Sequence, residues 1–275
     1  MQVTIWGLGA AGIAPSPNPL PQGEGECQVA RMRMRADQLL VNRGLAESRS
    51  RAQALILAGK VFSGDRRIAK AGDTLAAQAS LEVRGQDHPW VSRGGLKLDH
   101  ALHHFGLSPV GRVCLDIGAS TGGFTDVLLA HGATKVHAVD VGHGQLAWKL
   151  RADPRVVVHE RTNARYLTRE AIVDPIGALV CDASFIGLRT VLPAPLALCA
   201  PGAWAVALIK PQFEAGPDAV GSKGVVRDPA VHQAVCDRIH DWWSTLPGWG
   251  VVGIIESPIT GPEGNREFLI AAIRT

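Results

Sequence analysis

The sequence predicts an α/β fold in which a mostly parallel sheet carries helices on both faces. Two observations predict this fold and a smaller module that precedes it. From residue 92 onward, short apolar runs alternate with helical stretches, and several of these runs stop at a polar side chain, where such sheets bind ligands. A basic segment with helix and hairpin signals comes first, and it predicts a small α+β module at residues 32–85.

The small module reads as two helices and a few short strands. A helix from Asp37 closes at Gly44, and Ser48 can cap a second helix over residues 49–58. Strand-like runs separated by turns follow at residues 60–62 and 80–83. The order helix, helix, strand, strand is what an α+β module requires.

Charge is distributed unevenly along the chain. Residues 31–97 hold thirteen Lys and Arg against six Asp and Glu, whereas residues 98–275 hold fifteen against seventeen. A basic module on a near-neutral body is typical of nucleic-acid binding. The pattern R-x-D-x-x-L-x-x-R-G-L-x-x-S-R-x-x-A-x-x-L-I-x-x-G-x-V begins at residue 35 and, extended to about residue 84, resembles the small RNA-binding domain named after the fourth small-subunit ribosomal protein. The candidate RNA-contacting residues are Arg35, Arg43, Arg49, Arg51, Lys60, Arg66 and Arg67, with Arg93 further along the chain.

A linker at residues 86–91, stiffened by Pro89, leads into the second module at residues 92–275. The expected strands lie at 113–115, 136–139, 156–159, 178–181, 203–209, 251–255 and 267–270. Because only a turn separates the last two, we expect a terminal antiparallel hairpin.

The stretch from Val113 to Thr125 is the most informative in the chain. A strand is followed by a loop of Gly, Ala, Ser and Thr and then by a helical pattern. Glycines let the backbone approach a ligand, and the helix N-terminus faces it. The next strand ends at Asp140, and an acid there suits the two hydroxyls of a ribose. The candidate cofactor-binding residues are Asp116, Gly118, Ser120, Gly122, Gly123, Phe124, Asp140 and Asn163.

The glycine spacing distinguishes between cofactors. D-x-G-x-x-x-G-G is not the G-x-G-x-x-G of nicotinamide cofactors, and it resembles the S-adenosylmethionine loop of class I methyltransferases. A literal G-x-G-x-x-G does occur at residues 7–12. Four prolines follow it within ten residues and exclude the helix that a dinucleotide site needs.

Four charged residues stand out in the second module: Lys97, Asp182, Lys210 and Glu267. Lys210 ends a buried-looking strand, where a lysine is energetically unfavourable. In this order they resemble the Lys–Asp–Lys–Glu tetrad of ribose 2′-O-methyltransferases. The words S-R-G-G-x-K-L, D-I-G-A-S-T-G-G-F-T, D-x-S-F-I, K-P-Q-F-E and P-x-G-N-x-E resemble the TlyA family of ribosomal RNA (cytidine-2′-O)-methyltransferases, historically labelled haemolysins. The linker words at 88–91 depart from the Arg-containing linker of some members.

This resemblance implies a Rossmann-like class I methyltransferase fold that uses S-adenosylmethionine on ribosomal RNA without a metal. A ribose hydroxyl is a poor nucleophile until its proton is removed. A lysine can remove it only if the lysine pKa falls from about 10.4 towards neutrality, which burial and a second cation favour. We therefore expect Lys210 to be the base and Lys97 the neighbouring cation, with Asp182 and Glu267 as orienting groups.

Composition excludes several classes of protein. The five cysteines form no C-x-x-C pair, so buried reduced thiols in a cytoplasmic protein are expected. No run reaches the roughly 18 apolar residues that span a bilayer, and no basic segment marks a signal peptide. We expect no membrane partner, and the pattern indicates no oligomeric state.

Residues 1–31 match nothing in the family and are rich in proline. A chain beginning at Met32 is therefore expected to fold and to keep its activity. Its melting temperature and turnover, compared with those of the full chain, check this; a loss of either would contradict it.

Three alternatives stay open. A non-catalytic RNA-binding or ribosome assembly factor would share the basic module, and a haemolysin would share the family label. A methyltransferase acting on exocyclic amines would usually carry an Asp/Asn-Pro-Pro-aromatic word, where this chain has D-A-S-F. Family members linked to both ribosomal subunits carry extra residues at both ends. The end of this chain directly after its last expected strand thus implies one target, a 23S rRNA cytidine in the 50S subunit.

Overall fold

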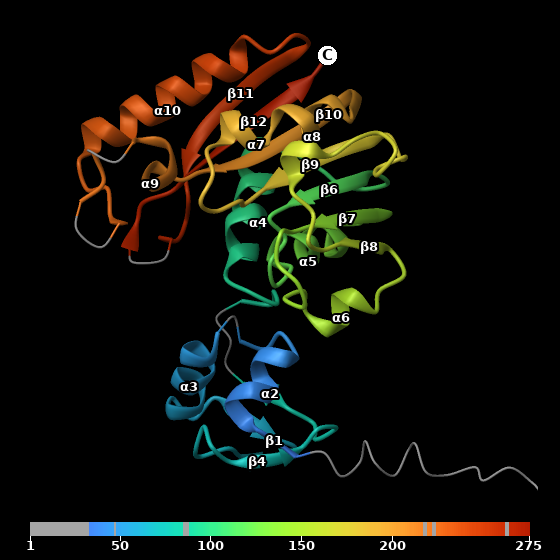
Figure 1. The fold of residues 1–275 in the computed structure, drawn as a ribbon, viewed down its shortest axis with the longest axis vertical. Helices are drawn as coiled ribbons and strands as arrows, with labels where there is room; N and C mark the ends of the chain where they lie inside the picture. The colour runs from blue at the N-terminus through green and yellow to red at the C-terminus, as the bar shows by residue number, and fades with distance from the viewer. Residues whose placement is uncertain (1–32, 47, 85–87, 217–218, 222–223, 262–263) are drawn as a thin grey trace, which may run out of the picture.

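The structure, a computed structural model, describes residues 33–275 apart from 47, 85–87, 217–218, 222–223 and 262–263. The G-x-G-x-x-G of residues 7–12, like all of residues 1–31, lies outside the described residues. Figure 1 shows the small module below the sheet of the larger one, joined to it by the linker.

A seven-stranded sheet forms the centre of the large module, in the order β11-β12-β10-β9-β6-β7-β8. All seven expected strands are present, mostly with longer bounds. They are β6 (Val113–Ile117), β7 (Lys135–Val139), β8 (Val156–His159), β9 (Ile176–Cys181), β10 (Cys199–Ile209), β11 (Trp249–Glu256) and β12 (Phe268–Arg274). The sheet is parallel except for β12, which runs antiparallel to both β10 and β11. The terminal hairpin is therefore confirmed.

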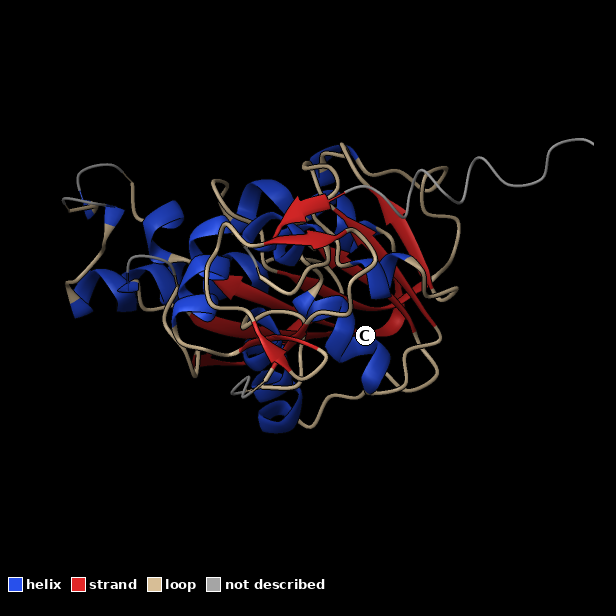
Figure 2. Cartoon of the chain, turned by 90° about the horizontal axis from the view of Figure 1, so that it is seen from below, coloured by secondary structure: helices blue, strands red, loops and turns tan. Residues whose placement is uncertain are grey.

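Helices cover both faces of this sheet (Figure 2). One face is covered by α4 (Gly94–Phe105), α5 (Gly123–Ala130) and α6 (Trp148–Arg151). The other is covered by the 3₁₀ turn η1 (Ala164–Tyr166), α7 (Leu188–Val191), α8 (Pro193–Ala197) and α10 (Pro229–Ser244). A further short helix, α9 (Pro211–Glu214), follows β10. The alternation of strand and helix in the sequence predicts this layering, because each crossover must return over one face.

The core lies on both sides of β10, whose residues 203–209 are all buried. Because both faces are covered, this strand reads as a continuous apolar run rather than an alternating one. The thiols of Cys114 and Cys181 are in the core, and burial raises their pKa to about 12. Thiols with such pKa values are inert, in agreement with the expected buried reduced cysteines.

The small module contains two helices and five short strands. They are β1 (Arg33–Arg35), α2 (Ala36–Asn42), α3 (Arg49–Leu57), β2 (Val61–Ser63), β3 (Arg66–Arg67), β4 (Thr74–Ala76) and β5 (Glu82–Val83). Ser48 caps α3 as expected, accepting a hydrogen bond from the Arg51 amide at 3.2 Å. The β1–β4 pair was not expected, because three-residue strands are too short for their periodicity to be read.

The linker residues Trp90 and Val91 dock on the large module. The ring of Trp90 lies over Gly95, at the start of α4, and the Val91 amide donates to the Asp126 carboxylate at 2.8 Å. Gly44, after α2, lies so close to Ala147 that a side chain there would overlap it. These contacts place the small module beside α4 and α6.

Candidate active site

Two adjoining cavities open at the carboxyl ends of the parallel strands. One is about 440 Å³ and is lined by Asp140, Asn163 and the residues around them, while the other is about 220 Å³ and is lined by Lys97 and Lys210. Four residues line both cavities: Gly118, Ser120, Asp182 and Ser184. A ligand in the larger cavity can therefore present a group to the smaller one.

The loop between β6 and α5 forms the floor shared by both cavities. Gly118 has a φ of 78°, and a Cβ on it would lie 2.9 Å from the backbone of Ala183, so only glycine fits there. The Asp140 carboxylate holds the loop in place, since it accepts from the Ser120 amide at 2.8 Å and the Gly142 amide at 2.7 Å. The acid thus fixes the loop and faces the larger cavity.

Two of the eight expected cofactor-binding residues lie behind the cavity walls. Asp116 is fully buried inside β6 and accepts from the Thr125 hydroxyl at 2.6 Å. Burial raises its pKa to about 7, against the opposing effect of that hydrogen bond. Gly122 packs against Leu146 and Leu150. Neither lines a cavity, so both support the loop from beneath; the other six line the cavities.

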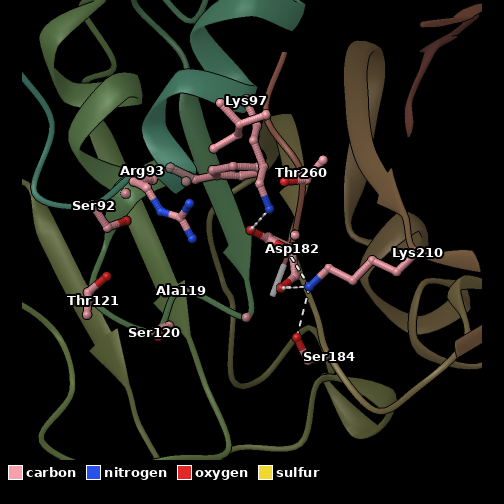
Figure 3. A pocket seen from close by; sticks show the side chains of 16 residues that line it. Ser92, Arg93, Lys97, Ala119, Ser120, Thr121, Asp182, Ser184, Lys210 and Thr260 are labelled. Carbon is pink, nitrogen blue, oxygen red and sulfur yellow. Dashed lines mark hydrogen bonds and ion pairs between the residues drawn. The ribbon is translucent and has the colours of Figure 1, made fainter. Parts of the chain in front are cut away.

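The four charged residues form one continuous chain. Glu267 lies 2.7 Å from the Lys97 ammonium, which lies 3.7 Å from one oxygen of Asp182. The other Asp182 oxygen lies 2.6 Å from the Lys210 ammonium. Figure 3 shows both lysines reaching the Asp182 carboxylate. The sequence brings these residues together from α4 and from the ends of β9 and β10 and the start of β12, and their charges alternate in sign.

The structure corrects one detail of the expected arrangement. Lys97 was expected to act as a cation directly beside Lys210, but the Asp182 carboxylate lies between them. Glu267 is fully buried and lines neither cavity, and its ion pair is with Lys97, which lines the smaller one. The position of the Glu267 side chain requires a glycine at residue 261, because a Cβ on Gly261 would overlap the Glu267 carboxylate.

Lys97 lies on a helix that the strand pattern did not reveal. Helix α4 buries Leu98, Ala101 and Leu102 against the sheet. This spacing of three and four residues, extended by Phe105, is a helical signal that was present in the sequence.

Two residues that line the cavities were missed by the sequence reasoning. Ser184 accepts a hydrogen bond from Lys210 at 2.8 Å and lines both cavities. Phe185 is 90% exposed at the larger cavity and has a φ of 64°. A positive φ is uncommon outside glycine, and for an exposed aromatic residue it marks a constrained position. Both residues belong to the motif D-x-S-F-I, but only its first residue, Asp182, was proposed as a site residue from the sequence.

Three of the expected RNA-contacting arginines also stabilise the small module. Arg35 and Arg49 lie 3.0 and 3.2 Å from the buried Asp37 carboxylate, and the Arg35 hydrogen bond is the main cause that holds the Asp37 pKa well below its usual range. Arg43 donates to two carbonyl oxygens of the loop between β4 and β5. The RNA contacts of all three remain predictions.

Arg51, Arg66 and Arg67 are exposed, with no ion pair to any residue that the structure describes. Lys60 is half-buried, and Arg93 lines the smaller cavity, into which Figure 3 shows it pointing. The exposed arginines are thus the better placed for phosphates, whereas Arg93 belongs to the catalytic end of the molecule.

Comparison with protein families agrees with the fold described above. The FtsJ-like methyltransferase model matches residues 90–274, about two thirds of the chain. The chain belongs to the FtsJ-like methyltransferase family. Its small module matches the S4 domain over residues 34–79. The expected α/β class and RNA-binding module are therefore confirmed, and the FtsJ-like methyltransferase fold implies use of S-adenosylmethionine.

Several known proteins are similar to this FtsJ-like methyltransferase over most of its length. A protein of Mycobacterium tuberculosis named 16S/23S rRNA (cytidine-2′-O)-methyltransferase TlyA is 49% identical, over 86% of this chain and 89% of its own. The 23S rRNA (cytidine-2′-O)-methyltransferase TlyA of Campylobacter jejuni is 36% identical, and the match covers 67% of this chain and 71% of the Campylobacter protein. A solved structure described as a hemolysin from Streptococcus thermophilus is 41% identical, with a TM-score of 0.70. The match covers 88% of this chain and 89% of the Streptococcus chain.

Proposed function

We propose that the protein transfers a methyl group from S-adenosylmethionine to the ribose 2′-hydroxyl of a cytidine in 23S ribosomal RNA. The observation that carries the proposal is the Glu267–Lys97–Asp182–Lys210 chain, in which Lys210 lines the smaller cavity and contacts Asp182, a residue that lines both cavities. The named relatives act on cytidine ribose in ribosomal RNA, which supports the substrate class.

The larger cavity fits the cofactor. Asp140 stands at the end of β7, where each carboxylate oxygen accepts one backbone amide and retains a lone pair for a ribose hydroxyl. Gly118, Ser120 and Asn163 complete its walls, while Phe124 lines the smaller cavity beside it. When bound, the cofactor supplies an activated sulfonium methyl group, so the protein chiefly positions the reactants.

Lys210 is placed to take the hydroxyl proton. A neutral amine has two N–H bonds and one lone pair. The Lys210 nitrogen contacts three oxygens: the Ser184 hydroxyl at 2.8 Å, the Asp182 carboxylate at 2.6 Å and the Asp182 backbone carbonyl at 3.3 Å. In the neutral amine the two N–H groups keep the two shorter contacts, and the lone pair replaces the longest contact and accepts the hydroxyl proton. Lys97, which Glu267 holds at 2.7 Å, lies 3.7 Å from the other Asp182 oxygen, and this attraction favours the orientation in which Asp182 faces Lys210.

Replacing Asp140 with alanine is expected to weaken S-adenosylmethionine binding about tenfold to hundredfold, because charge-assisted hydrogen bonds contribute about 1.5–3 kcal/mol. The same change releases the Ser120 amide and thus the loop. Calorimetric titration measures the affinity. An unchanged Kd would remove Asp140 from the cofactor site.

The S4 domain supplies RNA affinity through phosphate contacts. Because each contact releases counterions, replacing Arg51, Arg66 or Arg67 singly with alanine should flatten the plot of log affinity against log salt by roughly one unit. Filter binding at several salt concentrations measures it. Unchanged slopes in all three variants would place the RNA surface elsewhere.

The proposed reaction is tested with separate 30S and 50S subunits and labelled cofactor. We expect label in the 50S subunit, on the ribose of a cytidine. Label on a base would overturn the proposal. Comparable label in the 30S subunit would refute the single target and leave the enzyme class intact, as the Mycobacterium relative's name illustrates.

The two other functions have less support. A non-catalytic assembly factor would have no use for a buried lysine–carboxylate chain at a cavity junction. A haemolysin is favoured only by the names of relatives, and no helix among the described residues is long and apolar enough to cross a membrane. Methyl transfer by the purified protein separates the enzyme from both.

A further inference from the structure

The loop from Asp182 to Leu188 carries two groups that line the larger cavity, Ser184 and Phe185. Its first residue, Asp182, is held by β6 and by Lys97. Beyond Asp182, the loop contacts residues 210–214, the K-P-Q-F-E segment: Ser184 accepts a hydrogen bond from Lys210 at 2.8 Å, and the ring of Phe185 lies 5.1 Å from that of Phe213.

Glu214 makes a third contact between residues 210–214 and this loop. Its Oε1 accepts a hydrogen bond from the Leu188 amide at 2.6 Å, at the first residue of α7. Its backbone oxygen accepts from Arg238 of α10, which fixes the segment from behind. Burial raises the Glu214 pKa, opposed by the Leu188 hydrogen bond and by Arg238 and Arg189. A half-buried carboxyl group that reaches across to another segment of the chain in this way needs a reason.

Strain in the loop supplies that reason. Phe185 has a φ of 64° and is 90% exposed, so the contact of its ring with Phe213 is too small to hold the backbone there by itself. Such a conformation is strained and persists only when its surroundings impose it. The Lys210–Ser184 bond fixes one end of the loop, and the Glu214–Leu188 bond fixes the other.

We infer that Glu214 is a positioning residue: it anchors the loop so that Ser184 reaches Lys210 and Phe185 stands at the mouth of the cavity. The inference deepens the proposed function and rests on it. Glu214 itself lines neither cavity, so its effect must pass through the loop.

The test compares E214A, E214Q, S184A and the E214A/S184A double variant in single-turnover methyl transfer. We expect E214A to lower the rate about tenfold, and S184A similarly, with the RNA Kd within a few fold of the wild-type value. In E214Q the amide oxygen still accepts from Leu188, so most of the rate should return. The double variant should be no slower than the slower single variant, because both changes disturb the same contact.

D153A is the matched control. Asp153 also accepts a backbone amide, that of Arg155 at 2.9 Å, but it lies between α6 and β8 at the far edge of the sheet. D153A should retain the wild-type rate with a similar change in melting temperature. The inference is overturned if E214A is within twofold of wild type, if E214Q is as slow as E214A, or if the losses multiply in the double variant.

Two further measurements keep the inference testable in every case. If E214A is too unstable to purify, G187A replaces it, because the new methyl would lie 3.1 Å from Glu214 Oε2 and push the carboxylate away from its position beside Leu188 by a few tenths of an ångström. An unchanged rate in G187A would count against the inference. If the wild type methylates no RNA, the proposed function fails. Hydrogen exchange at residues 183–188 then decides the inference: faster exchange in E214A but not in E214Q supports it, and equal exchange in both overturns it.

Discussion

Replacing Lys210 with methionine is expected to abolish methyl transfer while leaving S-adenosylmethionine affinity within a few fold of the wild-type value. Methionine keeps an unbranched apolar stem in the buried position and removes only the amine that contacts Asp182 and Ser184. Removal of a general base typically lowers a rate by about 10²- to 10⁴-fold. Single-turnover transfer to ribosomal RNA measures the rate, and calorimetry measures the cofactor affinity.

Lys135→Met is the control for this experiment. Lys135 also pairs with a carboxylate, Asp174 at 2.9 Å, but it lies at the opposite end of the sheet, at the start of β7. Its replacement should leave the rate nearly unchanged. A Lys210→Met variant with near-normal turnover would assign the base to another group. A variant that loses cofactor affinity as well would show that Lys210 contributes to binding.

The sequence predicted the sheet well because its strands are buried on both faces. Continuous apolar runs such as residues 203–209 have no other stable place in a chain of this length. Short exposed elements were missed, as β1 and β4 show, since three residues carry no readable period. Boundaries differed where a strand continues past its polar end, as at Asp116, which lies inside β6 rather than after it.

The residues of the site were predicted better than their arrangement. Strand-end polar residues converge because parallel strands end at one edge of the sheet, which is a property of topology alone. Which carboxylate faces which lysine depends on side-chain geometry, and no spacing gives it. Asp182 between the two lysines, and Glu267 behind Lys97, therefore had to come from the structure. Ser184 and Glu214 were missed for the same reason, because each acts through a single hydrogen bond.

Glu267→Ala is expected to destabilise the fold as well as the site. The Glu267 side chain is fully buried and that of Lys97 only 8% exposed, so the change leaves a buried ammonium without its nearest carboxylate. Breaking a buried pair in this way typically costs about 3–5 kcal/mol, which for a domain of this size lowers the melting temperature by on the order of 10 °C. Glu267→Gln keeps the volume and one acceptor, so its loss should be smaller.

Glu256→Ala serves as the matched control, because Glu256 precedes the same loop and pairs with Arg266 at the surface. Both partners are about half exposed, and such pairs contribute about 0–1 kcal/mol. The contrast between the two variants separates burial from charge pairing as the source of stability. Equal melting temperatures for Glu267→Ala and Glu256→Ala would mean that Lys97 finds another partner once Glu267 is gone. Asp182 is the nearest candidate, at 3.7 Å. In that case catalysis should still fall, because an Asp182 carboxylate drawn towards Lys97 is drawn away from Lys210.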